Sequence, residues 1–508
     1  MVTDPTVATL WRSVVDRWSD RVAVHDLDEW GRPRAITFGA LFHRIEALAA
    51  MLRAQGLARG DRVAIVSSGF ERAHLEAEQA AMVGGFVRVS MDPSTHPIEL
   101  GAQLAHSGAK AIVFEPRCQS LVDAARDGSE FLVTLGSNET EAAILSSTFP
   151  IGPIPSALDL ASLNFTGGTT GRPRAVALTH GGYSSVILAV NASRPLGEGD
   201  LFLNVRPLWP ISGIIVAIHL LAGSPVVMGR PFEPNSFVAQ VEQWRPSHTS
   251  LVPTMLVRLC EDPRRQFDRL DSLRCVDVGA AGVPKARMRE AVDRIGPVFG
   301  AVYGLTEAPW TCYRAPGDLL EDDGSITTSV GRPVGNHSVW IEGDNGRVDQ
   351  GEIGEVVIEG PHVMAGYWND PDASARAIQG GAFRTGDLGR LDADGRLHLT
   401  GRVKDQIRTG GRSVEPREVE TAISGIPGVK DVVVIGLPDE EWGERVAALI
   451  IRHDPAITVE TVKNACQATL SAHKRPRRIL FVETIPRSHY GKPLRNELLA
   501  LFADAPPS

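Results

Sequence analysis

The chain has 508 residues, of which 43% are hydrophobic and 22% charged, and its formal net charge is −9 at pH 7. This length exceeds what one hydrophobic core usually supports, so we expect at least two domains. The acidic balance argues against a nucleic acid or an anionic membrane surface as partner, because both are negatively charged themselves.

The cysteines and the N-terminal residues indicate the cellular compartment. The five cysteines lie far apart without a Cys-x-x-Cys pair, so neither a disulfide framework nor a structural zinc site is indicated. The first residues, Met-Val-Thr-Asp-Pro, lack the basic start and apolar stretch of a secretory signal, and we expect a cytoplasmic protein. Residues 207–229 carry no charged side chain, but prolines and glycines leave only 211–221 as a short buried helix, so we expect no membrane span. The oligomeric state stays open.

In the first part of the chain, short β-branched runs alternate with amphipathic stretches. Residues 61–66 and 86–89 have the pattern of strands, and residues 71–83 between them carry apolar side chains three and four apart, as a helix does. Residues 97–107 and 111–114 repeat the unit. This rhythm predicts an α/β fold with a doubly wound sheet.

Farther along, the pattern changes twice. Around residues 351–360, short strands separated by glycine turns predict a small β-subdomain. After Lys404 a second set of elements is expected, with strands at 432–435, 446–451 and 479–482 and a helix at 459–470. We therefore predict a large N-terminal domain over residues 1–403 and a small α+β C-terminal domain over residues 404–508.

Residues 165–174, Phe-Thr-Gly-Gly-Thr-Thr-Gly-Arg-Pro-Arg, directly follow an apolar segment. Glycines let backbone N–H groups approach anionic oxygens, threonines add donors, and arginines add charge-assisted hydrogen bonds. The order of residues is not that of a Walker A loop, which needs Gly-x-x-x-x-Gly-Lys-Ser/Thr. The segment therefore predicts a nucleotide phosphate site of another type.

Four further motifs follow in order: Tyr-Gly-Leu-Thr-Glu at 303–307, Phe-Arg-Thr-Gly-Asp-Leu at 383–388, Gly-Arg-Val-Lys-Asp at 401–405, and Pro-Arg-Ser-His-Tyr-Gly-Lys-Pro-Leu-Arg at 486–495. Together with the loop, they make nearly the whole chain resemble the adenylate-forming superfamily of acyl- and aryl-CoA synthetases, nonribosomal peptide adenylation domains and luciferases. The resemblance implies a large N-terminal domain, a mobile C-terminal lid domain, and adenylation of an acid with ATP and Mg²⁺.

The resemblance also implies which residues bind the nucleotide. Tyr303 would stack on adenine, Asp387 would accept the ribose hydroxyls, and Arg402 would reach ribose and phosphate. Asp387 and Arg402 could instead form a structural ion pair. Arg174 stands where the family usually has lysine, which keeps the charge but changes its geometry. The complete implied set is Thr166, Gly167, Gly168, Thr169, Thr170, Gly171, Arg174, Ala280, Ala281, Tyr303, Gly304, Asp387 and Arg402.

Catalytic roles are implied in the same way. Glu307 would hold Mg²⁺, with Thr306 beside the same phosphate. Lys492 would bridge the acid and the α-phosphate, and Arg402 would assist from across the domain boundary. Lys404 resembles the hinge about which the lid rotates, withdrawing Lys492 and admitting a thiol.

The acid-binding motif departs from the family pattern. The family reads Pro-Leu-Phe/Tyr-His in acyl-CoA synthetases and Phe-Asp in α-amino-acid domains, whereas this chain reads Pro-Leu-Trp-Pro-Ile-Ser-Gly at 207–213. Pro210 cannot accept a hydrogen bond from an ammonium group, so an α-amino acid is disfavoured. The alternative for Trp209 is a core residue that points away from the substrate. With Ala280 and Ala281, the expected pocket is a flat apolar slot suited to an aromatic or apolar acid, formed by Trp209, Pro210, Ile211, Ser212, Gly213 and Gly279.

We therefore expect ATP-dependent adenylation of an aromatic or apolar carboxylic acid, with release of pyrophosphate, followed by transfer to coenzyme A. A carrier-protein phosphopantetheine presents the same thiol and is an alternative acceptor, and an amine could also intercept the adenylate of this or an unusual oxyacid. A non-catalytic nucleotide-binding regulator is the alternative from another class. Retention of Glu307, Asp387, Arg402 and Lys492 argues against it. The expected partners are small molecules, the acid and ATP, with a carrier protein as an alternative and no nucleic acid.

Overall fold

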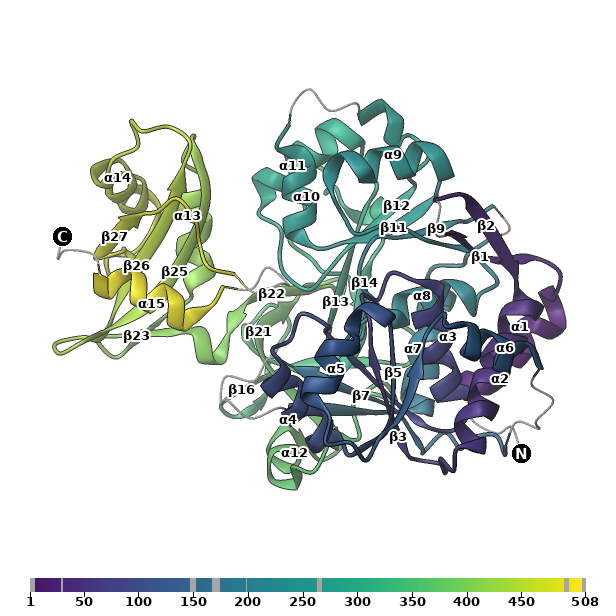
Figure 1. The fold of residues 1–508 in the computed structure, drawn as a ribbon. Coiled ribbons are helices and arrows are strands. Elements are labelled where there is room, and N and C mark those ends of the chain that lie inside the picture. Colours follow the sequence, from purple (N-terminus) through teal and green to yellow (C-terminus); the bar gives the residue numbers. More distant parts are fainter. Residues whose placement is uncertain are drawn as a thin grey trace.

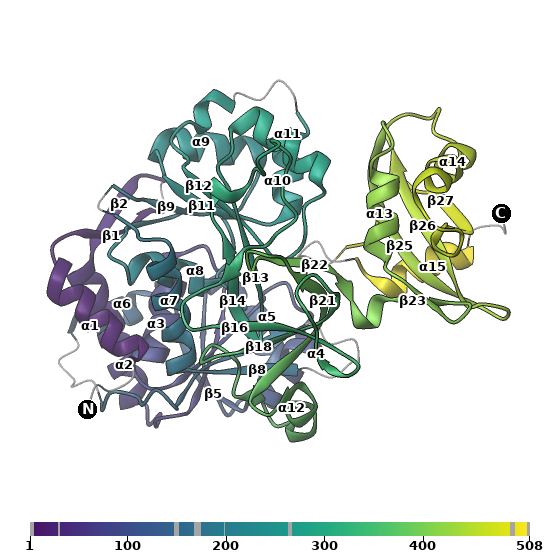
Figure 2. The same cartoon turned by 180° about the vertical axis from the view of Figure 1, so that it is seen from behind.

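The computed structural model describes residues 5–28, 31–146, 152–166, 174–197, 199–262, 267–487 and 493–504. Within these ranges the chain forms four sheets, three in a large N-terminal part and one in a C-terminal lobe. Figures 1 and 2 show this lobe set to one side of the large part, which it meets near residues 397–402. No helix in the described residues is long and apolar enough to cross a membrane.

The first sheet has the strand order β15-β14-β13-β12-β11-β9-β10-β1-β2. Its central strands, from β13 through β1, run parallel. The strand bounds are β1 (Val22–Leu27), β2 (Pro33–Thr37), β9 (Phe202–Asn204), β10 (Val226–Met228), β11 (His248–Leu251), β12 (Cys275–Val278), β13 (Phe299–Leu305), β14 (Ala308–Arg314) and β15 (Arg332–Pro333).

The second sheet has the order β19-β8-β7-β4-β3-β5-β6 and is parallel from β7 to β6. It confirms the predicted strand and helix alternation near the N-terminus, where the helix Arg72–Val83 follows the strand Arg62–Val66. Its strands are β3 (Arg62–Val66), β4 (Val87–Met91), β5 (Ala109–Phe114), β6 (Phe131–Thr134), β7 (Leu160–Thr166), β8 (Arg174–Thr179) and β19 (Gly366–Tyr367).

Helices cover these sheets and bury a continuous apolar core between them. The uncharged stretch at 207–229 contains the predicted short buried helix, α8, which spans Gly213–Leu220, and also the strand β10, which was not predicted. The helices of the large part are α1 (Val7–Trp18), α2 (Phe38–Ala54), α3 (Arg72–Val83), α4 (Pro97–Ser107), α5 (Gln119–Ala125), α6 (Asn138–Ser146), α7 (His180–Ser193), α8 (Gly213–Leu220), α9 (Pro234–Trp244), α10 (Pro253–Cys260), α11 (Lys285–Ile295) and α12 (Pro371–Ala377).

The predicted β-subdomain is an antiparallel sheet of order β17-β16-β18-β21-β20, with β22 paired to β21. Its strands are β16 (Ser338–Gly343), β17 (Gly346–Arg347), β18 (Gly354–Glu359), β20 (Ile378–Gln379), β21 (Ala382–Leu391) and β22 (Leu397–Arg402). The turn Val403–Asp405 then carries the chain into the C-terminal lobe, so the predicted domain boundary falls in a short connection between two sheets.

The C-terminal lobe has its own sheet, β24-β23-β26-β25 with β27 beside β26. The apolar clusters on its two faces are built from residues 407–502, as expected for a separately folding unit. The elements are β23 (Ile407–Thr409), β24 (Arg412–Val414), α13 (Pro416–Ser424), β25 (Val429–Asp439), β26 (Gly443–Arg452), α14 (Val459–Thr469), β27 (Arg478–Phe481) and α15 (Arg495–Asp504).

Candidate active site

The sequence motifs gather at one edge of the first sheet. Strands β9, β11, β12 and β13 are parallel neighbours, so their carboxyl ends lie in a row. The segment 207–213 follows β9, the segment 279–281 follows β12, and the segment 303–307 closes β13. Ligands of open α/β sheets bind outside the carboxyl ends of the strands. The topology therefore brings three motifs that are far apart in sequence to one candidate site.

Tyr303, Asp387 and Arg402 are in direct contact. The Tyr303 hydroxyl donates a hydrogen bond to Oδ2 of Asp387 at 2.9 Å, and Nε of Arg402 lies 2.8 Å from Oδ1. Asp387 and Arg402 face each other in the register of β21 and β22. Burial first, and then the Asp387 carboxylate, hold the pKa of Tyr303 well above its usual value.

The ion pair considered as an alternative for Asp387 and Arg402 is therefore present. It does not exclude ribose binding, because an ionised carboxylate offers about four lone-pair positions and only one on each oxygen is occupied by these contacts. Arg402 keeps 34% of its side chain exposed, so it is accessible to a ligand while it pairs with the buried Asp387. The three residues form one connected polar unit.

The backbone geometry at position 304 requires glycine. The register between β13 and β14 shifts at Tyr303 and Leu305, and a Cβ on Gly304 would collide with the backbone nitrogen of Trp310. The bulge therefore requires glycine here even without a ligand. Thr306 and Glu307 form the turn that follows, which places both at the tip of the hairpin.

Glu307 contacts a residue that the motifs did not reveal. The hydroxyl of Tyr367, on β19, donates to Oε1 of Glu307 at 3.0 Å. The guanidinium of Arg174 lies 4.9 Å from the centre of the Tyr367 ring. Burial and the neighbouring Glu307 raise the pKa of Tyr367, so its hydroxyl stays a donor. Tyr367 thus links the end of the phosphate loop to the expected magnesium ligand.

No local signal could have identified Tyr367, because its partners are remote in sequence. It reaches them because β19 pairs with β8, where Tyr367 lies opposite Val176. A half-buried carboxylate such as Glu307 suits Mg²⁺, which is typically bound by one or two carboxylates together with substrate phosphates. Among the described residues, no group of three His, Cys, Asp or Glu side chains is arranged to hold a metal ion.

Part of the predicted site lies outside the described residues, namely Gly167, Gly168, Thr169, Thr170, Gly171 and Lys492. The structure describes the residues on either side of these segments. Thr166 and Arg174 pair across the hairpin of β7 and β8, so the two ends of the phosphate loop lie side by side. Near the C-terminal motif, Arg487 pairs with Pro493 and binds Asp431 at 2.9 Å.

The acid motif is anchored from two sides. The Trp209 indole is buried, and its Nε1 donates to the carbonyl oxygen of Ser68 at 3.1 Å. A Cβ on Gly213 would collide with the Glu78 carboxylate, so glycine is needed for the close approach of these elements. Ile211 packs against the apolar cluster that contains Tyr303.

The other predicted pocket residues occupy the same edge. Pro210 is half-buried and follows a cis peptide bond. Gly279 lies against the Val302 carbonyl of the next strand, and Ala280 has a positive φ of 74°. Ser212 is buried and accepts a hydrogen bond at 3.2 Å from Arg206, a residue absent from the sequence prediction.

In the lobe, Lys404 lies exposed in the connecting turn. Gly410 and Gly411, which have φ of 55° and 73°, form the two-residue turn between β23 and β24, a geometry that requires glycine. The lobe contacts the large part through Lys430, whose Nζ lies 2.9 Å from Glu261 Oε1.

The chain matches the family model of the AMP-binding enzyme over residues 11–368 and that of the AMP-binding enzyme C-terminal domain over residues 418–492. A feruloyl-CoA synthase from an Amycolatopsis species is 33% identical over 476 residues, covering 92% of this chain and 94% of that protein. Both parts of the chain therefore have counterparts in known ligases.

Solved structures are also similar to this chain along nearly its whole length. ATP-bound MatB from Rhodopseudomonas palustris superposes with a TM-score of 0.89 at 27% identity, covering 98% of this chain and 99% of that one. The apo form of MatB gives 0.80 with the same identity and coverage. The amide bond synthetase McbA from Marinactinospora thermotolerans gives 0.87 at 30% identity, covering 98% of this chain and 100% of that one.

Proposed function

The chain belongs to the AMP-binding enzyme family and is an AMP-forming acid ligase, and from this premise we propose that it adenylates a carboxylic acid with ATP and passes the acyl group to coenzyme A. The observation that carries the proposal is the Tyr303–Asp387–Arg402 unit, because three motifs remote in sequence meet there in hydrogen-bonding distance. The name of the feruloyl-CoA synthase relative supports an aromatic acid and a coenzyme A acceptor.

The first step joins a carboxylate oxygen to the α-phosphorus of ATP and breaks the bond to pyrophosphate. Positioning and charge neutralisation supply most of the acceleration in such transfers. In our proposal Tyr303 packs against adenine, Asp387 accepts the ribose hydroxyls, and Arg402 and Lys492 neutralise the α-phosphate and acid. A magnesium ion at Glu307 would stabilise the charge that develops on the leaving pyrophosphate.

In the second step, the thiol sulfur bonds to the acyl carbon, AMP leaves, and the thiol proton is released. We propose that rotation of the lobe about Lys404 removes Lys492 from the site before this step and brings Gly410–Gly411 beside the thiol. The lobe has its own apolar cores, which supports its movement as a rigid unit.

The pocket supports an aromatic or apolar acid over an α-amino acid. Pro210 offers no acceptor for an ammonium group, and Ile211 packs against the apolar cluster that contains Tyr303. The chain is also similar to an amide bond synthetase along nearly its whole length, and this observation favours transfer to an amine as a second candidate.

One assay separates these possibilities. Purified protein is given ATP, Mg²⁺ and a panel of aryl, fatty, amino and inorganic acids, and pyrophosphate release is measured with coenzyme A, with a phosphopantetheinyl carrier protein, with an amine, or with none of them. Acid-dependent release accelerated by coenzyme A supports the proposal. If only the amine or only the carrier protein accelerates release, that compound is the acceptor in place of coenzyme A. Absence of release with every acid would refute the enzyme assignment.

A further inference from the structure

The C-terminal lobe is joined to the large part by side-chain contacts as well as by the turn at Lys404. Nζ of Lys430, at the start of β25, lies 2.9 Å from Oε1 of Glu261, which directly follows α10. Arg287 of α11 donates from Nη2 to the Lys430 carbonyl oxygen at 3.2 Å. The side chains of Lys430 and Glu261 stay 35% and 47% exposed, so this ion pair forms and breaks at little cost in free energy.

A second contact comes from α13. Arg417, near the start of this helix, donates from Nη1 to the Leu399 carbonyl oxygen of β22 at 3.4 Å. Its Nη2 lies directly against Gly282, where a Cβ would overlap the guanidinium. Gly282 follows Ala281, which belongs to the segment that we expect beside the nucleotide. Arg417 therefore reaches from the lobe to the edge of the candidate site.

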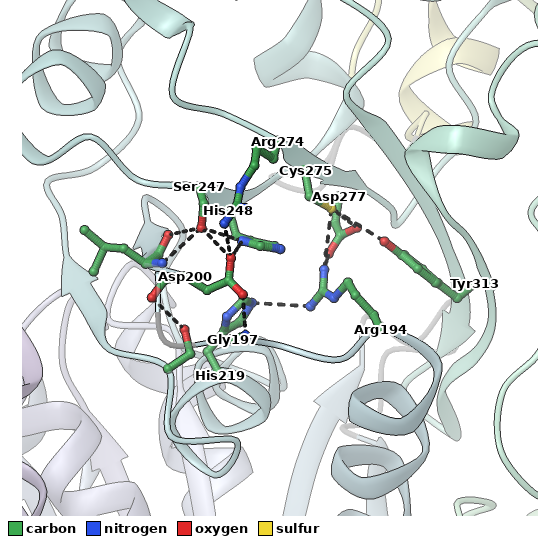
Figure 3. Close-up of polar contacts among 12 residues, drawn as sticks. Arg194, Gly197, Asp200, His219, Ser247, His248, Arg274, Cys275, Asp277 and Tyr313 are labelled. Carbon is green, nitrogen blue, oxygen red and sulfur yellow. Dashed lines mark hydrogen bonds and ion pairs between the residues drawn. The ribbon is translucent and has the colours of Figure 1, made fainter. Parts of the chain in front are cut away.

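The loop that Arg417 touches begins at a firmly held strand. It follows β12, where Asp277 is bound by Arg194 from the end of α7, and Cys275 and Tyr313 lie beside this ion pair (Figure 3). Asp277 and Cys275 are buried, and a buried ion pair resists displacement because breaking it leaves an uncompensated charge. The start of the loop is therefore fixed whether or not the lobe is docked.

A third contact lies beside the expected hinge. The Glu415 carboxylate accepts a hydrogen bond from Gln406 at 2.6 Å and lies against Gly401, where a Cβ would overlap Oε2. Gly401 precedes the turn Val403–Asp405 and Glu415 follows it. Rotation of the lobe about Lys404 would therefore separate the carboxylate from Gly401.

These contacts place the C-terminal motif on the side of the lobe that meets the large part. Lys430 is followed by Asp431, whose carboxylate binds Arg487 at 2.9 Å, and Arg487 pairs with Pro493. Arg487 and Pro493 are the described residues on either side of Lys492. The two ends of the motif are thus tied to the strand that carries the Lys430 ion pair.

The glycine turn lies at the other end of the lobe. The backbone N–H of Gly410 donates to the Trp442 carbonyl oxygen at 2.9 Å, which places Gly410–Gly411 beside the turn between β25 and β26. Figures 1 and 2 show this end of the β25–β26 hairpin projecting away from the large part. In the proposed function, Lys492 acts in adenylation and the glycine turn in thioester formation. The docked orientation therefore suits the first step.

We propose that the contacts of Lys430, Arg417 and Glu415 with the large part hold the lobe in position for adenylation and break before thioester formation. The proposal rests on the proposed function and adds to it the residues that set the balance between its two steps. They are positioning residues, because they act through the lobe. A partly exposed ion pair contributes little free energy, which suits a contact that forms and breaks in each catalytic cycle.

Charge reversal tests this proposal in each half-reaction separately. The acid is the one that gives the fastest pyrophosphate release in the panel of aryl, fatty, amino and inorganic acids. Glu261→Lys and Lys430→Glu should each lower kcat/KM for pyrophosphate release about threefold to tenfold, because a like-charge contact replaces a partly exposed ion pair. Thioester formation from the isolated acyl-adenylate and coenzyme A should not slow. The two substitutions together should restore pyrophosphate release to within about twofold of the wild-type rate.

Glu242→Lys is the matched control. Glu242 pairs with Arg269 at 2.8 Å inside the large part, and its side chain is 48% exposed, nearly as much as that of Glu261. Its reversal breaks a similar ion pair that does not involve the lobe. Both half-reactions should therefore keep their wild-type rates.

The orientation of the lobe is measurable without any substrate. The five native cysteines are buried, so spin labels attached to Ser120→Cys and Lys463→Cys, at exposed positions of α5 and α14, report the distance between the two parts. In double electron–electron resonance, Glu261→Lys should reduce the population at the wild-type distance. The combined reversal with Lys430→Glu should restore that population.

Three results would overturn the inference while the proposed function stands: equal slowing of both half-reactions by charge reversal, no recovery in the doubly reversed protein, or a distance distribution that Glu261→Lys leaves unchanged. The first result would show a structural role. No pyrophosphate release with any acid would instead refute the proposed function, and the distance measurement would then decide whether these contacts hold the lobe.

Discussion

Removal of the Tyr367 hydroxyl should slow adenylation, the step for which we expect a magnesium ion at Glu307. Tyr367→Phe deletes the hydrogen bond to Glu307, 3.0 Å long, but keeps the ring on which the Arg174 guanidinium stacks at 4.9 Å. A hydrogen bond to a charged group contributes about 1.5–3 kcal/mol, and the half-buried position of Tyr367 favours the lower end. About 1.5 kcal/mol corresponds to a roughly tenfold fall in kcat/KM.

The assay is pyrophosphate release at varied Mg²⁺ concentration, in a double-mutant cycle with Glu307→Gln. If Tyr367 acts through Glu307, its removal should raise the Mg²⁺ concentration for half-maximal rate in the native background and change little in the Glu307→Gln background. Tyr183→Phe is the control, because the buried Tyr183 hydroxyl has no hydrogen-bond partner among the described residues and lies in the core. An equal loss in both backgrounds, or an unchanged Mg²⁺ dependence, would refute the reasoning.

Three further predictions concern other parts of the chain. Asp387→Asn should raise KM for ATP about tenfold or more in initial-rate measurements. The substitution removes the negative charge that pairs with Arg402 and one acceptor for the ribose hydroxyls. An unchanged KM would indicate that the Asp387–Arg402 pair is structural. Lys492→Ala should abolish adenylation but spare thioester formation from a preformed acyl-adenylate, and normal pyrophosphate release by this variant would contradict its role. Burial raises the pKa of Glu420 to about 7, although the hydrogen bond from the Val434 N–H acts in the opposite direction. The free energy of unfolding should therefore fall as the pH rises from 5 through 7, because ionised Glu420 is destabilised only in the folded state. In urea titrations Glu420→Gln should reduce this fall, and the same pH dependence in both proteins would contradict the prediction.

The motifs were readable in the sequence because each is a local run with its own chemistry. The strand and helix alternation was readable for the same reason: residues 71–83, with apolar positions three and four apart, are helical from Arg72 to Val83, and the expected helix at 459–470 spans Val459–Thr469. Local periodicity reports which face of an element is buried, and this is enough to predict the element and the fold class.

Contacts between distant segments were not readable in this way. Tyr367 reaches Glu307 only because a two-residue strand pairs with β8, and Gly304 is fixed by the backbone of Trp310 across a bulge. Arg206 carries no motif, and its position beside Ser250 depends on the order of β9 and β11 in the sheet.

The sequence by itself therefore determined the family and the fold class, because those depend on residue types at short spacing and on local periodicity. Only the tertiary structure decided that Asp387 contacts Tyr303 and Arg402 at once and that Tyr367 reaches Glu307. Strand order and register set these contacts, and both result from packing of the whole sheet rather than from any local run of residues.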